Sequence, residues 1–169
     1  MAEARKRRGD LPVSEPLIID QAVLDAASEA ARESPRGRRN RNFHLANEAP
    51  CHRLLNAIEP GSYVAPHRHL DPTKDESILI LRGRLGCVFF DDDGRIGRKC
   101  LLSPNGAVGV DIPHGAWHSI VALDSGTVFF EAKAGPYLAL SADEIAPWAP
   151  REGDGGAAAF CAVLRSQFD

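Results

Sequence analysis

The segment PHRHLDPTKDE, residues 66–76, contains the side chains of this chain that are best suited to metal chemistry. His67 and His69 are two positions apart, so in an extended segment both imidazoles point to the same face. Neutral imidazoles placed in this way can bind one metal ion at a distance of roughly 2.1 Å. Six residues separate His69 from Glu76, which is enough for a turn that brings Glu76 back beside the histidines. The spacing predicts two imidazoles and a carboxylate around one ion.

A third histidine ligand is expected from a distant part of the chain, the segment DIPHGAWHSIV. A turn through Pro113 and Gly115 would place His118 at the beginning of a strand. Histidine and carboxylate ligands suit Fe, Mn, Ni, Co or Zn, and the ligand types alone do not choose among these divalent ions. The predicted metal ligands are therefore His67, His69, Glu76 and His118. The three remaining histidines, His44, His52 and His114, are predicted to be solvated.

Four further residues are candidates for contact with a substrate. Lys74 and Asp75 lie in the loop between the predicted ligand strands, where a substrate contact or a general acid or base is well placed. Lys133 and Tyr137, in FEAKAGPY, could donate hydrogen bonds to an anionic or sugar ligand. The competing interpretation of Lys133 is a buried ion pair with Glu131. No catalytic role is assigned to any of these four residues.

The elements that must position these residues are mostly short strands. From residue 43 to about 139, runs such as HRLLNAI, SYVAPH, ESILILR, GRLGCVFFD and TVFFEAK alternate with turn signals such as DDDG and SPNG. Before them, Asp20 and the helical spacing of the apolar residues after it predict one helix over about 20–33, followed by a basic loop. The segment AAAFCAVLRSQF at 157–168 fits either a last strand or a short helix. We expect residues 1–42 to form a tail, a helix and a basic loop, and residues 43–169 to form a β-barrel domain.

Composition excludes several classes of protein. The chain has 169 residues, 44% of them hydrophobic, which suits one globular domain. A net charge of −3 disfavours nucleic-acid binding, and the basic runs at 5–8 and 36–41 are interpreted as solvated. The apolar runs are too short to cross a membrane, and no apolar segment of a secretion signal follows the basic N-terminus, so we expect a cytoplasmic protein. The four cysteines form no C-x-x-C pair.

The predicted ligands resemble the two motifs of the cupin family, G-x5-H-x-H-x3,4-E-x6-G and G-x5-P-x-G-x2-H-x3-N. Gly61, His67 and His69 fit the first motif, and Glu76 keeps its spacing to Gly83. The gap between His69 and Glu76 is longer than in the family, which leaves either Glu76 or Asp75 as the carboxylate ligand. In the second motif His118 is in register with Pro113 and Gly115, the proline comes one residue late relative to Gly106, and Ala122 replaces the asparagine.

A more extensive resemblance links EPGSYVAPHRHLDPTKDE, ILRGRLGCVFFDDDG, FEAKAGPY and APWAPREG to the WbuC-type cupin metalloproteins. It implies an all-β fold, the double-stranded β-helix or jelly-roll barrel, with one divalent metal ion and with a link to lipopolysaccharide O-antigen biosynthesis. The main functional hypothesis is a metal-dependent enzyme, an isomerase, epimerase or oxygenase, acting on a small polar ligand such as a sugar or nucleotide sugar. A non-catalytic ligand-sensing module and a structural zinc site are the alternatives. By analogy with other cupins we expect a homodimer.

Overall fold

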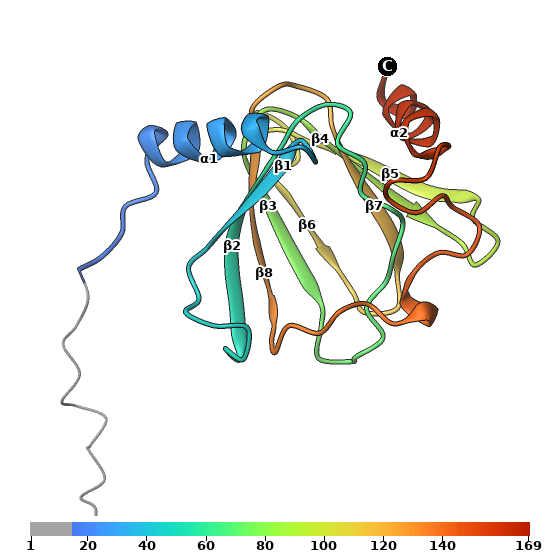
Figure 1. The fold of residues 1–169 in the computed structure, drawn as a ribbon, viewed down its shortest axis with the longest axis horizontal. Helices are drawn as coiled ribbons and strands as arrows, with labels where there is room; N and C mark the ends of the chain where they lie inside the picture. Colours follow the sequence, from blue (N-terminus) through green and yellow to red (C-terminus); the bar gives the residue numbers. More distant parts are fainter. Residues whose placement is uncertain (1–14) are drawn as a thin grey trace, which may run out of the picture.

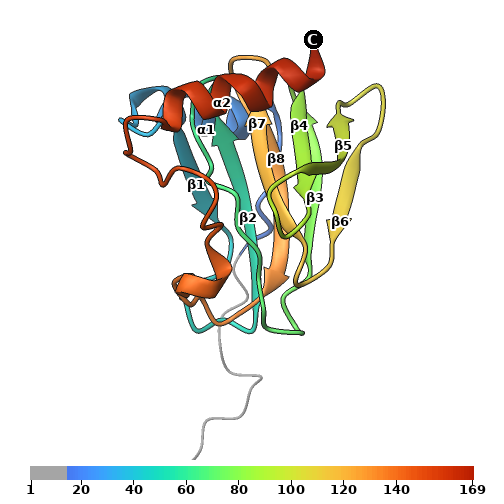
Figure 2. The ribbon, with the colours of Figure 1, turned by 90° about the vertical axis from the view of Figure 1, so that its right-hand side faces the viewer.

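The computed structural model describes residues 15–169 and consists of two antiparallel sheets that face each other (Figures 1 and 2). The larger sheet has the strand order β1-β2-β8-β3-β6 and the smaller one the order β5-β4-β7. The strands of the larger sheet are β1 (Arg38–Asn42), β2 (Cys51–Ile58), β3 (Glu76–Arg82), β6 (Gly109–Ile112) and β8 (Thr127–Ala134). Those of the smaller sheet are β4 (Leu85–Phe90), β5 (Ile96–Leu102) and β7 (Trp117–Ala122). The predicted all-β architecture is confirmed.

The main core lies between the two sheets. Along β3 the side chains alternate strictly, so that Ile78 and Ile80 are buried while Ser77 and Leu79 are exposed. This alternation follows from the two-residue period of a strand, and it directs one face of β3 into the barrel. The inward face packs against Phe129 of β8 and against residues of the smaller sheet in one continuous cluster. The part of the barrel interior that this cluster fills is therefore apolar.

Helix α1 (Gln21–Glu33) covers the outer face of the larger sheet (Figure 1). The carboxylate of Asp20 accepts a hydrogen bond from the backbone N–H of Val23 and so caps the first turn. Leu24, Ala27 and Ala31 form the buried side of the helix and pack against β2 and β8. The helix predicted over about 20–33 is confirmed.

The C-terminal segment is a helix, which settles the ambiguity of its sequence. Helix α2 (Ala157–Arg165) places Ala157, Cys161 and Leu164 against Val88 and Val121 on the outer face of the smaller sheet. Two short 3₁₀ helices complete the chain, η1 (Ala142–Glu144) and η2 (Ser166–Phe168). Figure 2 shows α2 crossing one end of the molecule. With α1 on the larger sheet and α2 on the smaller one, each sheet has one helix on its outer face.

Two predictions about local structure are wrong. The basic segment predicted as a loop contains strand β1, whose five residues pair in antiparallel register with β2. A polar sequence can form a strand when a neighbouring strand provides the partners for its backbone hydrogen bonds. The segment SYVAPH, predicted as a strand, is extended without belonging to a sheet, and only His67 takes part in isolated bridges.

Among the described residues, no helix has the length and apolar character needed to span a membrane. The basic run at 5–8 lies outside the part of the chain that the structure describes.

Candidate metal centre

The segment with His67 and His69 is held against the beginning of β7. The backbone N–H groups of His67 and His118 each donate to the other residue's carbonyl oxygen, at 3.0 and 2.9 Å. On its other side the segment is fixed by Ala146, whose N–H donates to Pro66 O at 3.1 Å. His69 O accepts a hydrogen bond from Gly115 N at 2.7 Å. These contacts explain how histidines about fifty residues apart in sequence become neighbours.

The imidazoles of His67, His69 and His118 converge on one point. Their ligand nitrogens all lie within 4.8 Å of one another, close to the span that bonds of roughly 2.1 Å to a shared ion allow. The ring centroids of His67 and His118 are 4.4 Å apart. Those of His67 and His69 are 5.4 Å apart. The described residues therefore contain a cluster of three nitrogen donors.

Backbone carbonyls orient two of these rings for metal binding. Nδ1 of His67 lies 3.0 Å from Ala65 O, and Nδ1 of His118 lies 2.9 Å from Ala116 O. A carbonyl only accepts, so each Nδ1 carries the proton and each Nε2 presents a lone pair. Nε2 of His118 is buried and has no hydrogen-bond partner. A buried polar atom without a partner is costly, and binding of an ion by this nitrogen would remove that cost.

Burial keeps two of the rings neutral. The pKa of His67 is lowered from 6.5 to about 3, mainly by burial and secondly by the repulsion between its charged form and a protonated His118. Burial likewise lowers the pKa of His118. Both rings are therefore uncharged near neutral pH, which is the state in which an imidazole binds a metal ion.

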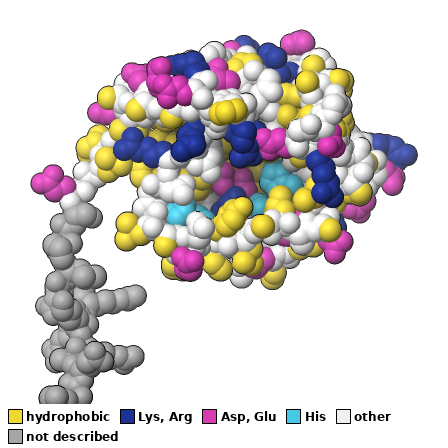
Figure 3. All heavy atoms as spheres, in the orientation of Figure 1, with side chains coloured by type: hydrophobic (Ala, Val, Ile, Leu, Met, Phe, Trp, Pro, Cys, Tyr) yellow, Lys and Arg dark blue, Asp and Glu magenta, His cyan; other side chains and the backbone are white. Residues whose placement is uncertain are grey.

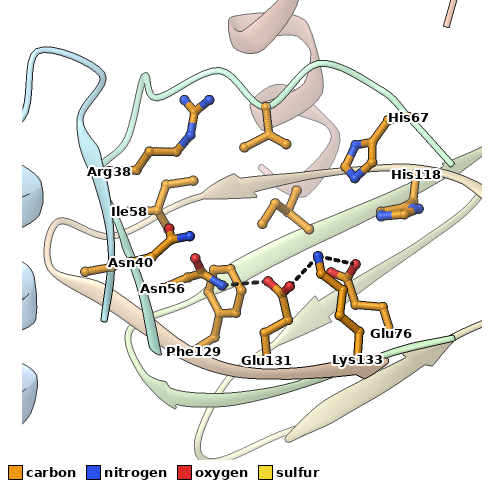
Figure 4. A pocket seen from close by; sticks show the side chains of 13 residues that line it. Arg38, Asn40, Asn56, Ile58, His67, Glu76, His118, Phe129, Glu131 and Lys133 are labelled. Carbon is orange, nitrogen blue, oxygen red and sulfur yellow. Dashed lines mark hydrogen bonds and ion pairs between the residues drawn. The ribbon is translucent and has the colours of Figure 1, made fainter. Parts of the chain in front are cut away.

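A buried network of charges adjoins the histidines (Figure 4). Glu76 Oε2 lies 3.2 Å from Nε2 of His69 and 3.4 Å from Nζ of Lys133. The same ammonium group lies 2.6 Å from Glu131 Oε1, and Glu131 Oε2 accepts a hydrogen bond from Asn56 at 2.6 Å. Two carboxylates thus share one lysine, and the network extends from the histidine cluster to the wall of the barrel.

The two carboxylates differ in their ionisation. Burial alone would raise the pKa of Glu76, but its hydrogen bond with His69 and the charge of Lys133 outweigh burial and lower it. Burial and the charge of Glu76 raise the pKa of Glu131. Because the carboxylates share the same cation, their pKa values shift in opposite directions, and Glu76 is the more readily ionised of the two, which is the state that binds a metal ion.

A cavity of about 140 Å³ connects the histidines with strands β1 and β2. Figure 3 shows it as a hollow in which acidic and histidine side chains are visible. Its polar wall is lined by Arg38, Asn40 and Asn56. Asn40 and Asn56 are paired across β1 and β2, and they face the interior as Glu131 does. Val64, Ile120 and Phe129 belong to its apolar wall. Figure 4 shows Arg38 at the opposite end from His67 and His118.

Comparisons with known proteins agree with this architecture. A family model described as a domain of unknown function, DUF6016, matches residues 19–102. The SPY1581 protein of unknown function from Streptococcus pyogenes has a TM-score of 0.50 at 10% identity, over 75% of this chain and 93% of that one. Together with two facing antiparallel sheets that bring both histidine motifs into one barrel, this likeness decides the fold. The fold is a double-stranded β-helix, the jelly-roll barrel that the sequence predicted.

Other solved structures of similar shape include KdgF from a Halomonas species, with a TM-score of 0.49 at 19% identity over 63% of this chain and 85% of that one. Oxalate decarboxylase of Bacillus subtilis, a protein with Mn(II) centres, has a TM-score of 0.46 at 19% identity, and the match covers 60% of this chain and 26% of the decarboxylase. A search of the curated proteins found no match.

The other residues predicted for the site lie at different places around the cavity. Lys133 lines the cavity and also forms the buried ion pair with Glu131 that was its competing interpretation. Lys74 is buried and donates to Pro136 O at 2.8 Å, beside an outer cavity of about 190 Å³ that Tyr137 also lines. Asp75 is exposed, and its carboxylate accepts hydrogen bonds at 2.8 Å from the backbone N–H and the ring of His114.

The prediction that His52 is solvated is wrong. His52 is buried, its ring stacks on that of His44 with centroids 4.1 Å apart, and its Nε2 lies 3.0 Å from Asn47 O. Pairing of β2 with β8 places His52 opposite Lys133, and both side chains line the same outer cavity.

Sequence reasoning missed the polar wall formed by Arg38, Asn40 and Asn56. The signal was present, because Arg38, Asn40 and Asn42 alternate in the segment RRNRN as residues on one face of a strand do. A polar face toward a barrel interior is unusual, since inner faces of sandwiches and barrels are usually apolar. For this reason the sequence RRNRN predicts a loop and not a strand.

Proposed function

We propose that this cupin is a metal-dependent enzyme that holds one divalent ion and acts on a small polar ligand in the adjoining cavity. His67, His69, His118 and Glu76 would hold the ion. The observation that carries the proposal is the buried, partnerless Nε2 of His118, which points to the same place as two other imidazoles. An apolar side chain would fill this position at lower cost if no ligand were to be bound.

A set of three histidines and one carboxylate leaves coordination positions open on an octahedral ion. A bound ion of this kind supplies Lewis acidity toward an oxygen of the ligand. The protein would supply the rest. Asn40 and Asn56 can both donate to and accept from hydroxyl groups, and the apolar wall around Phe129 excludes water from the opposite side.

Proton transfer is the chemistry that the cavity supports best. Glu131 is a buried carboxyl whose pKa is raised by burial and by the charge of Glu76. Burial acts to lower the pKa of Lys133, but the charges of Glu76 and Glu131 outweigh it and raise that pKa, so Lys133 stays an ammonium group that holds the two carboxylates. A general acid or base works best when its pKa is shifted toward the working pH. Of the predicted reaction types, these residues favour an isomerase or epimerase over an oxygenase.

A hydroxyl-rich ligand of the sugar type fits the polar wall. Both nearby cations are already matched by carboxylates, Lys133 by Glu76 and Glu131, and Arg38 by Glu152 at 2.6 Å. Amide groups paired with carboxylates are suited to hydroxyl groups of a ligand. The resemblance to WbuC-type proteins, the link to lipopolysaccharide O-antigen synthesis, the homodimer and the cytoplasmic location stay predictions from the sequence.

The test is proton exchange in deuterated water. Metal-loaded protein is incubated with a panel of aldoses and ketoses, and incorporation of deuterium beside the carbonyl carbon is followed by proton NMR. We expect exchange that is lost in Glu131→Gln and kept in Glu48→Gln, which removes an exposed carboxylate. Stabilisation of the protein by one of these sugars without any exchange would contradict an enzyme and identify a ligand-sensing module instead.

A further inference from the structure

Two cysteines face each other across neighbouring strands of the smaller sheet. Cys87 of β4 and Cys100 of β5 are direct partners in the antiparallel register. Direct partners share one face of a sheet, and their Cα atoms lie about 4.5 or 5.5 Å apart depending on the kind of pair. Both distances fall within the range that a disulfide requires, roughly 4.4–6.8 Å. The register therefore places these two residues within the distance range of a disulfide.

Both side chains point into the barrel. Cys87 is fully buried in the core between the sheets, and Cys100 packs against the same core cluster. All four cysteines of the chain are free thiols. Cys51 is exposed at the beginning of β2 and Cys161 lies in α2, on the outer face of the smaller sheet, so neither of them is a neighbour of this pair.

The pair is next to the metal cavity. Cys87 is the register partner of Ile120 on β7, and Ile120 lines the cavity. Two positions further along the same two strands, and so on the same face of the sheet, Phe89 is paired with His118. A covalent change at the two thiols would therefore act on side chains that pack directly beside a candidate metal ligand.

We propose that Cys87 and Cys100 form an oxidation site that closes a cross-strand disulfide when the protein meets a hydroperoxide. The site is separate from the proposed enzymatic function, and its existence does not depend on metal binding. Because β5 is an edge strand of its sheet, Cys100 is the accessible member of the pair. It is the thiol that reacts first.

The electrostatics of Cys100 agree with this order. Its pKa is lowered to about 7, first by a hydrogen bond with the Cys87 thiol, against the effect of burial and with help from Arg98. The pKa of Cys87 is raised, first by the same hydrogen bond and then by burial. The thiolate is the reactive form of cysteine, so the pair has one nucleophile and one resolving thiol.

The chemistry balances with hydrogen peroxide as the oxidant. The Cys100 thiolate attacks one peroxide oxygen, the O–O bond breaks, and Cys100 becomes a sulfenic acid while hydroxide leaves and is protonated to water. The sulfur of Cys87 then attacks the sulfenic sulfur, the S–O bond breaks, and the leaving hydroxide takes the proton of the Cys87 thiol. Two thiols are oxidised, one peroxide is reduced, and two waters form.

The test begins with the full-length protein carrying Cys51→Ser and Cys161→Ser, so that only the pair remains. After treatment with hydrogen peroxide, we expect both thiols to disappear, the intact mass to fall by two hydrogens, and digestion to yield one peptide that links positions 87 and 100. Dithiothreitol should restore both thiols. In a matched variant that also carries Cys87→Ala, a dimedone adduct should appear at position 100 and the linked peptide should be absent.

Diamide, which oxidises thiol pairs without peroxide, gives a second measurement and avoids reactions of peroxide at a metal. Retention of both thiols after either oxidant would overturn the proposal. Linkage between two chains in place of the internal link would do the same. The wild-type protein is the control for effects of the two serine substitutions on folding. The same linked peptide should form in it after oxidation.

Discussion

His118 is the residue whose removal should most affect the metal site, because its Nε2 is buried and has no other partner. We expect His118→Ala to lower metal content by at least about tenfold, since fewer donors hold the ion, while the chain stays folded. Elemental analysis and circular dichroism measure the two quantities. His114→Ala is the matched control, because His114 is exposed and bound to Asp75. Full metal content in His118→Ala would show that this histidine is not a ligand.

Glu76 and Asp75 are adjacent carboxylates with different surroundings, which makes them a direct test of the fourth ligand. Glu76 is buried 3.2 Å from His69, whereas Asp75 is exposed and bound to His114. Glu76→Gln keeps the shape and removes the charge, so we expect weaker metal binding by about 10- to 100-fold in a titration, the range seen when residues around metal ligands are changed. Asp75→Asn should leave the affinity unchanged. The reverse order of effects would move the carboxylate ligand by one residue.

Acid should destabilise the metal-free protein through His67. The pKa of this residue is lowered from 6.5 to about 3, mainly by burial. Between these values the unfolded chain binds a proton that the folded chain does not, so the free energy of unfolding decreases as pH falls, by up to about 1.4 kcal/mol per pH unit. The lowered pKa of Glu76 acts in the same direction at the acid end. Above pH 6.5 His67 contributes no slope.

Urea denaturation of the metal-free protein at a series of pH values measures this slope. His67→Asn should give a shallower decrease between pH 6.5 and pH 4 than the parent protein, because it removes the group that titrates only in the unfolded chain. Equal slopes for the two proteins would show that the ring of His67 is not held neutral by burial.

At the scale of elements, the turn between β3 and β4 depends on Gly83. This residue has a φ of +75°, and a Cβ there would collide with the hydroxyl of Thr127. We expect Gly83→Ala to lower the free energy of unfolding by about 2 kcal/mol or more, as the backbone strain alone is of order 1–3 kcal/mol. Gly155→Ala is the control, because nothing lies within 4 Å of its Cβ position and its φ is not positive. Equal stability of both variants would contradict this role of the turn.

The elements differ in how well their sequences predicted them, for physical reasons. Helix α1 has a cap at Asp20 and an apolar stripe, and β3 is a short apolar run bounded by turn residues, so local patterns predict both. Strand β1 has no apolar residue, because its inner face lines a polar cavity and its backbone pairing with β2 holds it in place. Helix α2 remained open because AAAFCAVLR is apolar on most of its surface, which fits either element.

The candidate site was predicted in part for similar reasons. The spacing of His67 and His69 and the turn before His118 are local patterns, and the structure brings these three rings together. The roles of Asn40, Asn56 and Glu131 depend on which strands are neighbours in the sheet, and no local pattern gives that order. Register also decided the burial of His52, since pairing with β8 places it opposite Lys133.

At the scale of the whole molecule, the metal should stabilise a chain that folds without it. The core between the sheets is continuous and contains no predicted metal ligand. A metal at 1,000 times its dissociation constant adds about 4 kcal/mol of stability. We therefore expect a chelator to lower Tm while the chain keeps a cooperative transition, and His118→Ala to lose most of the increase that the metal gives. Complete unfolding after chelation would instead indicate a structural metal that staples the barrel.

The most direct test is a crystal structure of the purified protein with anomalous scattering data collected at the absorption edge of the metal found by elemental analysis. Our account predicts one anomalous peak at bonding distance from the Nε2 atoms of His67, His69 and His118, with the carboxylate of Glu76 beside it and at least one coordination position facing the cavity. The absence of a peak at full metal supply, or a peak elsewhere with the three rings apart, would contradict it.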